Sequence, residues 1–169
     1  MSKSKFKVMM IVFFDIRCVI YIDWLPVGQT VNQVYYKNVL TTLRERVRRR
    51  RPDMWKNASW ILHHDNNTPA HNALSVKRYL AKNNIPVMEH PPYSPDLAPC
   101  DFFLFPKIKS ALKGTRFESV DAVKAKATQL LNNITQDDLQ HCFQEWKIRM
   151  ERCRDRGGDY IKGDNISIV

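Results

Sequence analysis

The longest apolar run of the chain reads Val8-Met9-Met10-Ile11-Val12-Phe13-Phe14, and Asp15 follows it directly. Its apolar residues do not alternate with polar ones, so residues 5–14 are predicted to form a buried strand. Residues 19–25 are rich in β-branched and aromatic side chains and predict a second strand. The two strands are expected to pair as a hairpin through a turn at residues 15–18.

Amphipathic helices are expected to follow this hairpin. Thr30 and Gln33 form a capping-box pattern, which predicts that the first helix begins there, and Pro52 is expected to help stop it. The apolar residues that recur at helical spacing are expected to face the core: Tyr36, Leu40, Leu43 and Val47.

The rest of the chain interleaves short strands, at residues 59–64 and 86–88, with further helices. Capping residues and prolines predict where those helices begin: at Thr68 with Pro69, at Asp101, at Ser119, and at Thr135 with Asp138. The last helix is expected to bury a stripe made of Leu139, Cys142, Phe143, Trp146, Met150 and Cys153. These patterns predict an α/β fold with a mixed sheet flanked by helices.

Length and composition restrict the class of protein. The 169 residues are expected to form one domain, 1–169, with a loosely held tail at 158–169. The longest apolar run is too short to span a bilayer, so we expect no membrane partner, and we also expect no organic cofactor. The four cysteines are scattered without a CxxC pair, which argues against a zinc ribbon and a disulfide framework.

The formal net charge of +10 is concentrated in two blocks. One lies at residues 147–156, and the other consists of Arg44, Arg46, Arg48, Arg49, Arg50 and Arg51. Such blocks are typical of a solvated helix face, and the block of six arginines also of a localisation signal. They are equally typical of a surface that contacts phosphates. Beside a carboxylate site, the second interpretation is favoured, with Arg44, Arg48, Arg49, Arg50 and Arg51 as the DNA-binding residues.

Three aspartates occupy positions that suit a site for hard divalent cations. Asp15 and Asp65 each follow a predicted buried strand, and Asp101 lies just beyond a proline-rich segment. If the strand before Asp15 and the strand before Asp65 are parallel neighbours, both carboxylates emerge at the same edge of the sheet. Two Mg²⁺ or Mn²⁺ ions held by such carboxylates can support cleavage of a phosphodiester. Taken singly, each aspartate is also a common turn residue.

Histidines near Asp65 raise an alternative metal site. His63, His64 and His71 could be read as zinc ligands, but their spacing fits no standard zinc pattern. We therefore expect His63 and His64 to be residues at the end of a strand.

Several motifs resemble the signature blocks of mariner-family transposases. These are Phe13-Phe14-Asp15, Gly28-Gln29-Thr30-Val31-Asn32, His64-Asp65-Asn66 with Pro69-Ala70-His71, Tyr93-Ser94-Pro95-Asp96-Leu97-Ala98-Pro99, and Asp101-Phe102-Phe103-Leu104-Phe105. The resemblance covers essentially the whole chain. It implies a ribonuclease H-like catalytic core in which Asp15, Asp65 and Asp101 bind Mg²⁺ or Mn²⁺, whereas Asp96 shapes a turn.

The resemblance also implies an activity and partners. The chain would be a DNA transposase that nicks double-stranded DNA at transposon ends and uses the freed 3′ hydroxyl for strand transfer. A homodimer and a location in the nucleus are expected with it. The competing hypothesis is a catalytically weak remnant that binds DNA or another protein.

Three departures from the family pattern favour that competing hypothesis. One residue more separates Asp65 from Asp101, and it falls within Asn66-Asn67-Thr68. Cys18 stands where similar sequences usually have glycine, and it would be strained if the position needs a positive φ. The chain begins almost at the first catalytic strand, so the helix-turn-helix modules that recognise transposon ends are expected to be absent.

Overall fold

The computed structural model describes residues 7–64, 68–88 and 94–155. The chain divides into two compact units, which are treated separately below. The hairpin unit consists of Met1–Val27 and Pro95–Val169, and the inserted unit consists of Gly28–Ser94. The sequence-based expectation of one domain is not tested by this division and stays a prediction.

The hairpin unit begins with the predicted pair of strands. Strands β1 (Met10–Phe14) and β2 (Val19–Trp24) are antiparallel, with Phe13 opposite Tyr21 and their rings stacked. Residues 5 and 6 of the predicted strand lie outside the described residues, and residues 7–9 are not part of it, because the pairing with β2 ends at the bond from the Leu25 N–H to the Met9 carbonyl. The register shifts between Phe13 and Phe14, an irregularity of the kind that re-aims side chains beside functional sites.

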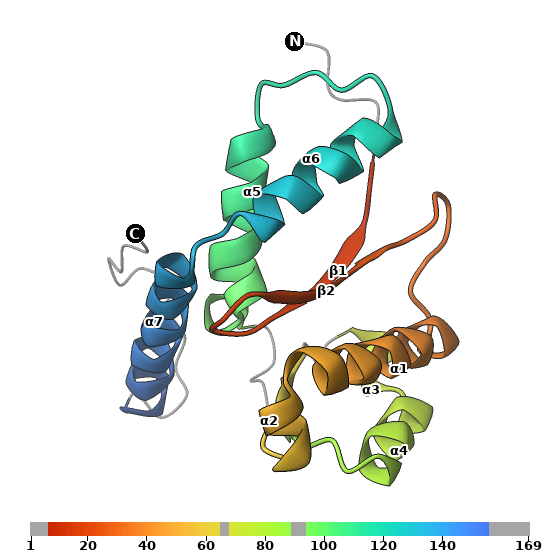
Figure 1. Ribbon diagram of the computed structural model, residues 1–169, viewed down its shortest axis with the longest axis vertical. Coiled ribbons are helices and arrows are strands. Elements are labelled where there is room, and N and C mark those ends of the chain that lie inside the picture. The colour runs from red at the N-terminus through yellow and green to blue at the C-terminus, as the bar shows by residue number, and fades with distance from the viewer. Residues whose placement is uncertain (1–6, 65–67, 89–93, 156–169) are drawn as a thin grey trace. The chain divides into compact units, whose positions relative to one another are not determined.

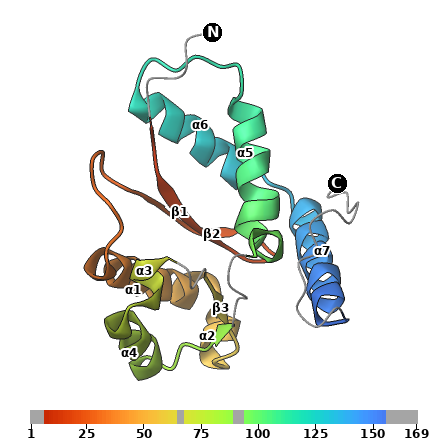
Figure 2. The same cartoon turned by 180° about the vertical axis from the view of Figure 1, so that it is seen from behind.

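Helices pack against this hairpin to form one core. The chain returns through η1 (Pro95–Leu97) and η2 (Cys100–Leu104) to α5 (Phe105–Leu112), α6 (Val120–Asn132) and α7 (Gln136–Asp155). Both views show α5 and α6 beside the hairpin (Figures 1 and 2). The buried residues of this core are Val12, Val19, Phe103, Leu104, Ile108, Ala127, Leu131, Leu139 and Cys142.

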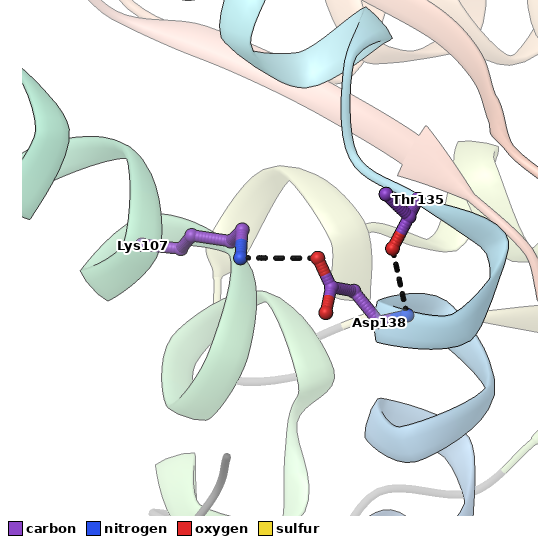
Figure 3. A network of polar contacts seen from close by, with 3 residues as sticks. All are labelled: Lys107, Thr135 and Asp138. Carbon is purple, nitrogen blue, oxygen red and sulfur yellow. Dashed lines mark hydrogen bonds and ion pairs between the residues drawn. The ribbon is translucent and has the colours of Figure 1, made fainter.

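A polar junction joins α5 to the beginning of α7 (Figure 3). The Asp138 N–H donates to Thr135 Oγ1 at 3.1 Å, which confirms the predicted cap of α7, and Lys107 Nζ lies 3.3 Å from Asp138 Oδ2. The predicted cap of α6 is confirmed as well, because the Ala122 N–H donates to Ser119 Oγ. The ion pair is solvent-exposed and contributes roughly 0–1 kcal/mol, so the cap is the stronger determinant of where α7 begins.

The inserted unit is mainly helical. It contains α1 (Gln33–Arg50), α2 (Pro52–Lys56), β3 (Leu62–His63), α3 (Pro69–Asn72), α4 (Leu74–Lys82) and β4 (Val87–Met88). Strands β3 and β4 are parallel, and α1 packs against α3 and α4. The predicted stripe of α1 is confirmed, since all of its members are buried: Tyr36, Leu40, Leu43 and Val47.

The start of α1 differs from the prediction. The capping-box pattern predicts Thr30 as the N-cap, but the N-cap is Asn32, two residues later. The Asn32 Oδ1 accepts from the Tyr35 N–H at 2.8 Å. Asparagine is as good a cap as threonine, but it has no Glu or Gln three residues on, so the capping-box pattern pointed to the wrong residue.

The helix expected from Asp101 begins instead as a π-helical turn. In η2 the Phe105 N–H bonds to the Cys100 carbonyl, and the regular α5 follows. Pro106 explains the change, because it has no N–H to donate to the Phe102 carbonyl and its ring crowds that carbonyl in an α-helix. Gly114 follows the end of α5 and has a φ of +83°.

Two further predictions need correction. The helix after Pro69 is interrupted at Ala73, whose backbone is extended, and no glycine or proline marks the break. On α7, Met150 is 38% exposed, whereas Arg149 beside it is 8% exposed and takes a place among the buried residues. None of the described helices is both long and apolar enough to cross a membrane.

Candidate functional site

Asp15 lies in the turn that joins β1 to β2, and its carboxylate is held by that turn. Its Oδ1 accepts from the N–H groups of Arg17 at 2.9 Å and Cys18 at 3.0 Å, and its own N–H donates to the Cys18 carbonyl at 3.1 Å. A carboxylate accepts about four hydrogen bonds, so these two fix its orientation and are compatible with a metal ion as well. The turn role and the metal role of Asp15 do not exclude one another.

Cys18 is not strained in this turn. Among the described residues, positive φ values occur at two glycines and at Ala58 and Asn84, and Cys18 is not one of them. Its N–H and carbonyl both bond to Asp15, as the preceding distances show. The replacement of glycine at this position therefore costs no backbone strain, and one argument for a decayed site is removed.

Asp101 is exposed in the π-helical turn η2. Its N–H donates to the Ala98 carbonyl at 2.9 Å, and the Phe102 N–H donates to the same carbonyl at 3.0 Å. Single π-turns of this kind are frequent at functional sites. Burial, with a contribution from the charge of Asp101, raises the pKa of the Cys100 thiol to about 12. Cys100 therefore stays protonated, so the hard oxygen donor of this turn is the carboxylate of Asp101, whose role as a metal ligand stays a prediction.

Helix α7 contacts the residue next to each of these two aspartates. Phe14, directly before Asp15, packs edge-on against Phe143 of α7 with ring centroids 5.9 Å apart. Phe102, directly after Asp101, lies 4.4 Å below the guanidinium of Arg149 on the same helix. The structure thus brings two of the three predicted ligands onto one packed unit, with hard oxygen donors of the type that Mg²⁺ and Mn²⁺ prefer.

Asp65, the third predicted ligand, lies outside the described residues. The described ranges contain no group of three or more His, Cys, Asp or Glu side chains that could hold a metal ion. This statement does not cover a site that includes Asp65. The predicted alignment of the strand before Asp15 with the strand before Asp65 concerns both units and stays a prediction.

A buried aromatic cluster holds the residue that precedes Asp65. Tyr36 on α1 shares a hydrogen bond of 2.7 Å between its hydroxyl and Nδ1 of His64, and its ring stacks on His71 with centroids 4.0 Å apart. The rings of His64 and His71 are also parallel, 5.1 Å apart. Burial raises the pKa of Tyr36, so its hydroxyl stays protonated. Two of the three histidines considered as zinc ligands, His64 and His71, thus belong to a packed cluster in the described part of the chain.

Replacing Tyr36 with phenylalanine keeps the stacked ring and removes the hydrogen bond to His64. We expect a loss of about 1–3 kcal/mol in the free energy of unfolding, because a buried polar group loses its partner. Urea unfolding measures this. Tyr79→Phe is the control: its hydroxyl accepts an exposed bond from Thr41 at 3.0 Å, and its removal should change stability by less than about 0.5 kcal/mol. Equal losses in the two variants would contradict a special role for the cluster.

The predicted DNA-binding arginines differ in their surroundings. Arg48, Arg49 and Arg50 are exposed on the last turn of α1. Arg44 is half-buried, with its guanidinium 4.8 Å above the ring of Trp55. Arg51 is 6% exposed and donates to the Arg50 carbonyl, so the structure separates it from the exposed members of the block.

One exposed arginine of this block has an acidic neighbour. Arg48 pairs with Glu45 at 2.6 Å, and this hydrogen bond holds the pKa of Glu45 below its usual value. The positive end of α1 also complements the helix dipole, which is the structural role that a basic helix end commonly has. The exposed surface formed by Arg48, Arg49 and Arg50 is nevertheless well placed to contact phosphates, since all three lie on one helix turn.

Comparison with known proteins places these residues in context. The family model described as "Transposase (partial DDE domain)" matches residues 2–57. The mariner Mos1 transposase of Drosophila mauritiana is 32% identical over 156 residues, which is 92% of this chain and 45% of that protein. The chain thus spans less than half of the length of this curated relative.

Solved structures of Mos1 show the same fold. The Mos1 transposase catalytic domain with raltegravir and Mn superposes with a TM-score of 0.85 at 33% identity, over 92% of this chain and 78% of that one. A Mos1 paired-end complex with the left transposon end gives a TM-score of 0.84 at 32% identity, over 96% of this chain and 47% of that one. The predicted ribonuclease H-like fold class, with its mixture of helices and sheet, is confirmed by this likeness.

Proposed function

The chain belongs to the mariner family of transposases, and from this premise we propose that it is a metal-dependent catalytic domain that nicks DNA at transposon ends and carries out strand transfer. The observation that carries the proposal is the pair Asp15 and Asp101. The Asp15 carboxylate is oriented by a hairpin turn, Asp101 is carried on a π-helical turn, and α7 packs against a neighbour of each.

Asp15, Asp65 and Asp101 would together hold two Mg²⁺ or Mn²⁺ ions. When bound, such ions supply activation of the attacking oxygen and stabilisation of the leaving oxygen in phosphodiester cleavage. The use of Mn in the Mos1 catalytic-domain structure supports this choice of ion. The role of the turns is to fix the carboxylate oxygens beforehand, so that little reorganisation is needed at the moment of reaction.

The reaction follows from the substrate class. In the first step a water oxygen forms a bond to the phosphorus, the bond from phosphorus to the 3′ oxygen breaks, and a 3′ hydroxyl and a 5′ phosphate result. In the second step that 3′ hydroxyl forms a bond to a phosphorus of the target DNA and displaces another 3′ oxygen. Arg44, Arg48, Arg49 and Arg50 would hold the duplex through its phosphates, because phosphate contacts position DNA without reading its sequence.

Two further parts of the proposal concern the assembly and its place in the cell. A homodimer would bring two catalytic domains to the paired ends of a transposon, and the paired-end complex of Mos1 with a transposon end supports DNA as a partner. A location in the nucleus would give access to that DNA, and the arginine block suits a nuclear localisation signal.

The chemical nature of the nick tests the proposed reaction. The purified chain is incubated with supercoiled plasmid and Mn²⁺, and the nicked circles are then treated with DNA ligase. We expect ligase to reseal them, since hydrolysis that frees a 3′ hydroxyl leaves a 5′ phosphate beside it. Nicked circles that ligase cannot seal, or DNA binding without any nicking, would contradict the proposal.

Metal binding can be observed separately from catalysis. Mn²⁺ at about 100 times its dissociation constant should stabilise the folded chain by about 2.7 kcal/mol, and its melting temperature should rise. Differential scanning fluorimetry measures the shift. Asp15→Asn should reduce the shift, whereas Asp23→Asn, which alters a carboxylate bonded to the Tyr21 hydroxyl, should retain it. An identical shift in melting temperature for both variants would show that Asp15 is not a metal ligand.

The extra residue between Asp65 and Asp101 gives a further prediction. Deleting Asn67 restores the family spacing, and we expect plasmid nicking to increase, because the position of the helix that begins at Pro69 affects where Asp65 lies. Asn67→Ala, which keeps the length, is the control and should leave the rate unchanged. Equal rates in the deletion and the control would mean that the turn absorbs the extra residue.

A further inference from the structure

Helix α7 buries one arginine on the face that carries its apolar residues. Arg149 is 8% exposed, and it lies between Trp146 and Cys153 at helical spacing. Burial of a guanidinium is costly unless its hydrogen bonds and charge are satisfied inside the protein. The contacts of Arg149 therefore identify the residues that it anchors to α7.

The partners of Arg149 lie on three different elements. Its Nε donates to Glu145 Oε1 at 3.2 Å within α7, where both side chains are largely buried. Its Nη1 donates to the backbone carbonyl of Asp96 in η1 at 3.0 Å, and its guanidinium carbon lies 4.4 Å from the centre of the Phe102 ring in η2. One planar group thus contacts the chain on both sides of Asp101, at Asp96 and at Phe102.

The segment 96–102 behaves as one piece because its backbone bonds are internal. The Ala98 N–H donates to the Pro95 carbonyl, and the Ala98 carbonyl accepts from the N–H groups of Asp101 and Phe102. Leu97 and Ala98 are buried. Anchoring Asp96 and Phe102 to α7 therefore leaves the π-turn that presents Asp101 little freedom to move.

We infer that Arg149 is a positioning residue that fixes the Asp101 carboxylate for metal binding; this inference rests on the proposed function. Stability alone does not explain an arginine here, since well-packed apolar side chains commonly replace a buried ion pair without loss. A planar guanidinium can donate sideways to a carbonyl and a carboxylate while its face covers an aromatic ring, and no apolar side chain or lysine does both. Arg149 also lies in the basic block at residues 147–156, but its burial excludes it from a phosphate-contacting surface.

The test measures Mn²⁺ affinity rather than nicking. Calorimetric titration of the full chain is compared for the unmodified protein, Arg149→Met, Arg149→Lys and Lys126→Met. We expect Arg149→Met to bind Mn²⁺ about 10-fold or more weakly, as for other residues that orient metal ligands, and Arg149→Lys to recover part of the loss. Lys126→Met removes one positive charge from an exposed position on α6 and should leave the affinity unchanged.

A second variant keeps the inference testable if Arg149→Met does not fold. Phe102→Leu retains an apolar side chain and removes the ring below the guanidinium, and it should also weaken Mn²⁺ binding. If the unmodified chain binds Mn²⁺ and folded Arg149→Met or Phe102→Leu binds it equally well, the positioning role is overturned while the proposed function stands. If the unmodified chain binds no Mn²⁺, the proposed function and this inference both fail.

Discussion

Asp101→Asn is expected to lower the rate of plasmid nicking by on the order of 10³-fold or more, equivalent to about 4 kcal/mol of lost transition-state stabilisation. Asparagine keeps the shape of the side chain but removes the charge that holds a hard divalent ion. The surrounding fold should persist, because Asp101 is exposed and its backbone bond to Ala98 is unaffected. Asp65→Asn is expected to have the same effect if Asp65 completes the site.

Stability measurements separate this effect from unfolding. Neutralising one carboxylate in a cluster of like charges removes repulsion, so the melting temperature of Asp101→Asn without metal should equal or exceed that of the unmodified chain. Asp138→Asn is the matched control: it neutralises an exposed carboxylate that pairs with Lys107, and it should nick DNA at the normal rate. Normal nicking by Asp101→Asn or Asp65→Asn would refute the assignment of the three aspartates.

Replacing Arg48, Arg49 and Arg50 together with glutamine should produce the second large effect. If each arginine contacts one phosphate, the slope of log affinity against log salt falls in magnitude by about 2.7, since each contact contributes about 0.9. At about 0.15 M salt, three such contacts contribute on the order of 10²-fold in affinity. The loss should be equal on a transposon-end duplex and on a scrambled duplex, because phosphates carry no sequence information.

The control for this variant carries the same change in charge. Lys109, Lys113 and Lys126 are exposed in the hairpin unit, and their joint replacement with glutamine also removes three positive charges. We expect it to change the salt slope much less than the arginine variant does. If both triple variants give the same slope, the arginines act only through net charge; if neither alters it, the end of α1 is a solvated helix end.

The hairpin and the main helices could be predicted because their signals are local. An unbroken apolar run, a β-branched segment and a turn determine β1 and β2, and helical spacing determines which residues of α1 are buried. The lengths of the strands could not be predicted, because a strand ends where its partner ends. Only Leu62–His63 is a strand in the predicted segment 59–64, since β4 offers two residues for pairing.

Arg149 shows where a sequence pattern admits two interpretations. From Trp146, a step of four residues along the helix leads to Met150 and a step of three leads to Arg149, and hydrophobicity favours the methionine. In the structure Arg149 is buried and Met150 is exposed, because the guanidinium of Arg149 bonds to Glu145 and Asp96 and covers the ring of Phe102. Those partners lie up to 53 positions away in the sequence, so local spacing does not reveal them.

The sequence proposed the residues of the candidate site but not their geometry. Motif resemblance proposed Asp15 and Asp101 as ligands, which stays a prediction, whereas the bonds that orient Asp15 and the π-turn that carries Asp101 follow from the turn at Cys18 and from Pro106. The cluster of Tyr36, His64 and His71 was likewise not foreseen, because it joins α1 to residues at least 28 positions away. The position of Asp65 stays a prediction.

The most direct test of the central claim is the dependence of plasmid nicking on metal for the unmodified chain. Supercoiled plasmid is incubated with the purified protein in Mn²⁺, in Mg²⁺ and in excess chelator, and the fraction of nicked circles is followed with time. The account predicts nicking that requires a divalent ion, increases with its concentration and stops when chelator is added. Nicking that continues undiminished in chelator, or no nicking at any concentration of Mn²⁺ or Mg²⁺, would contradict it.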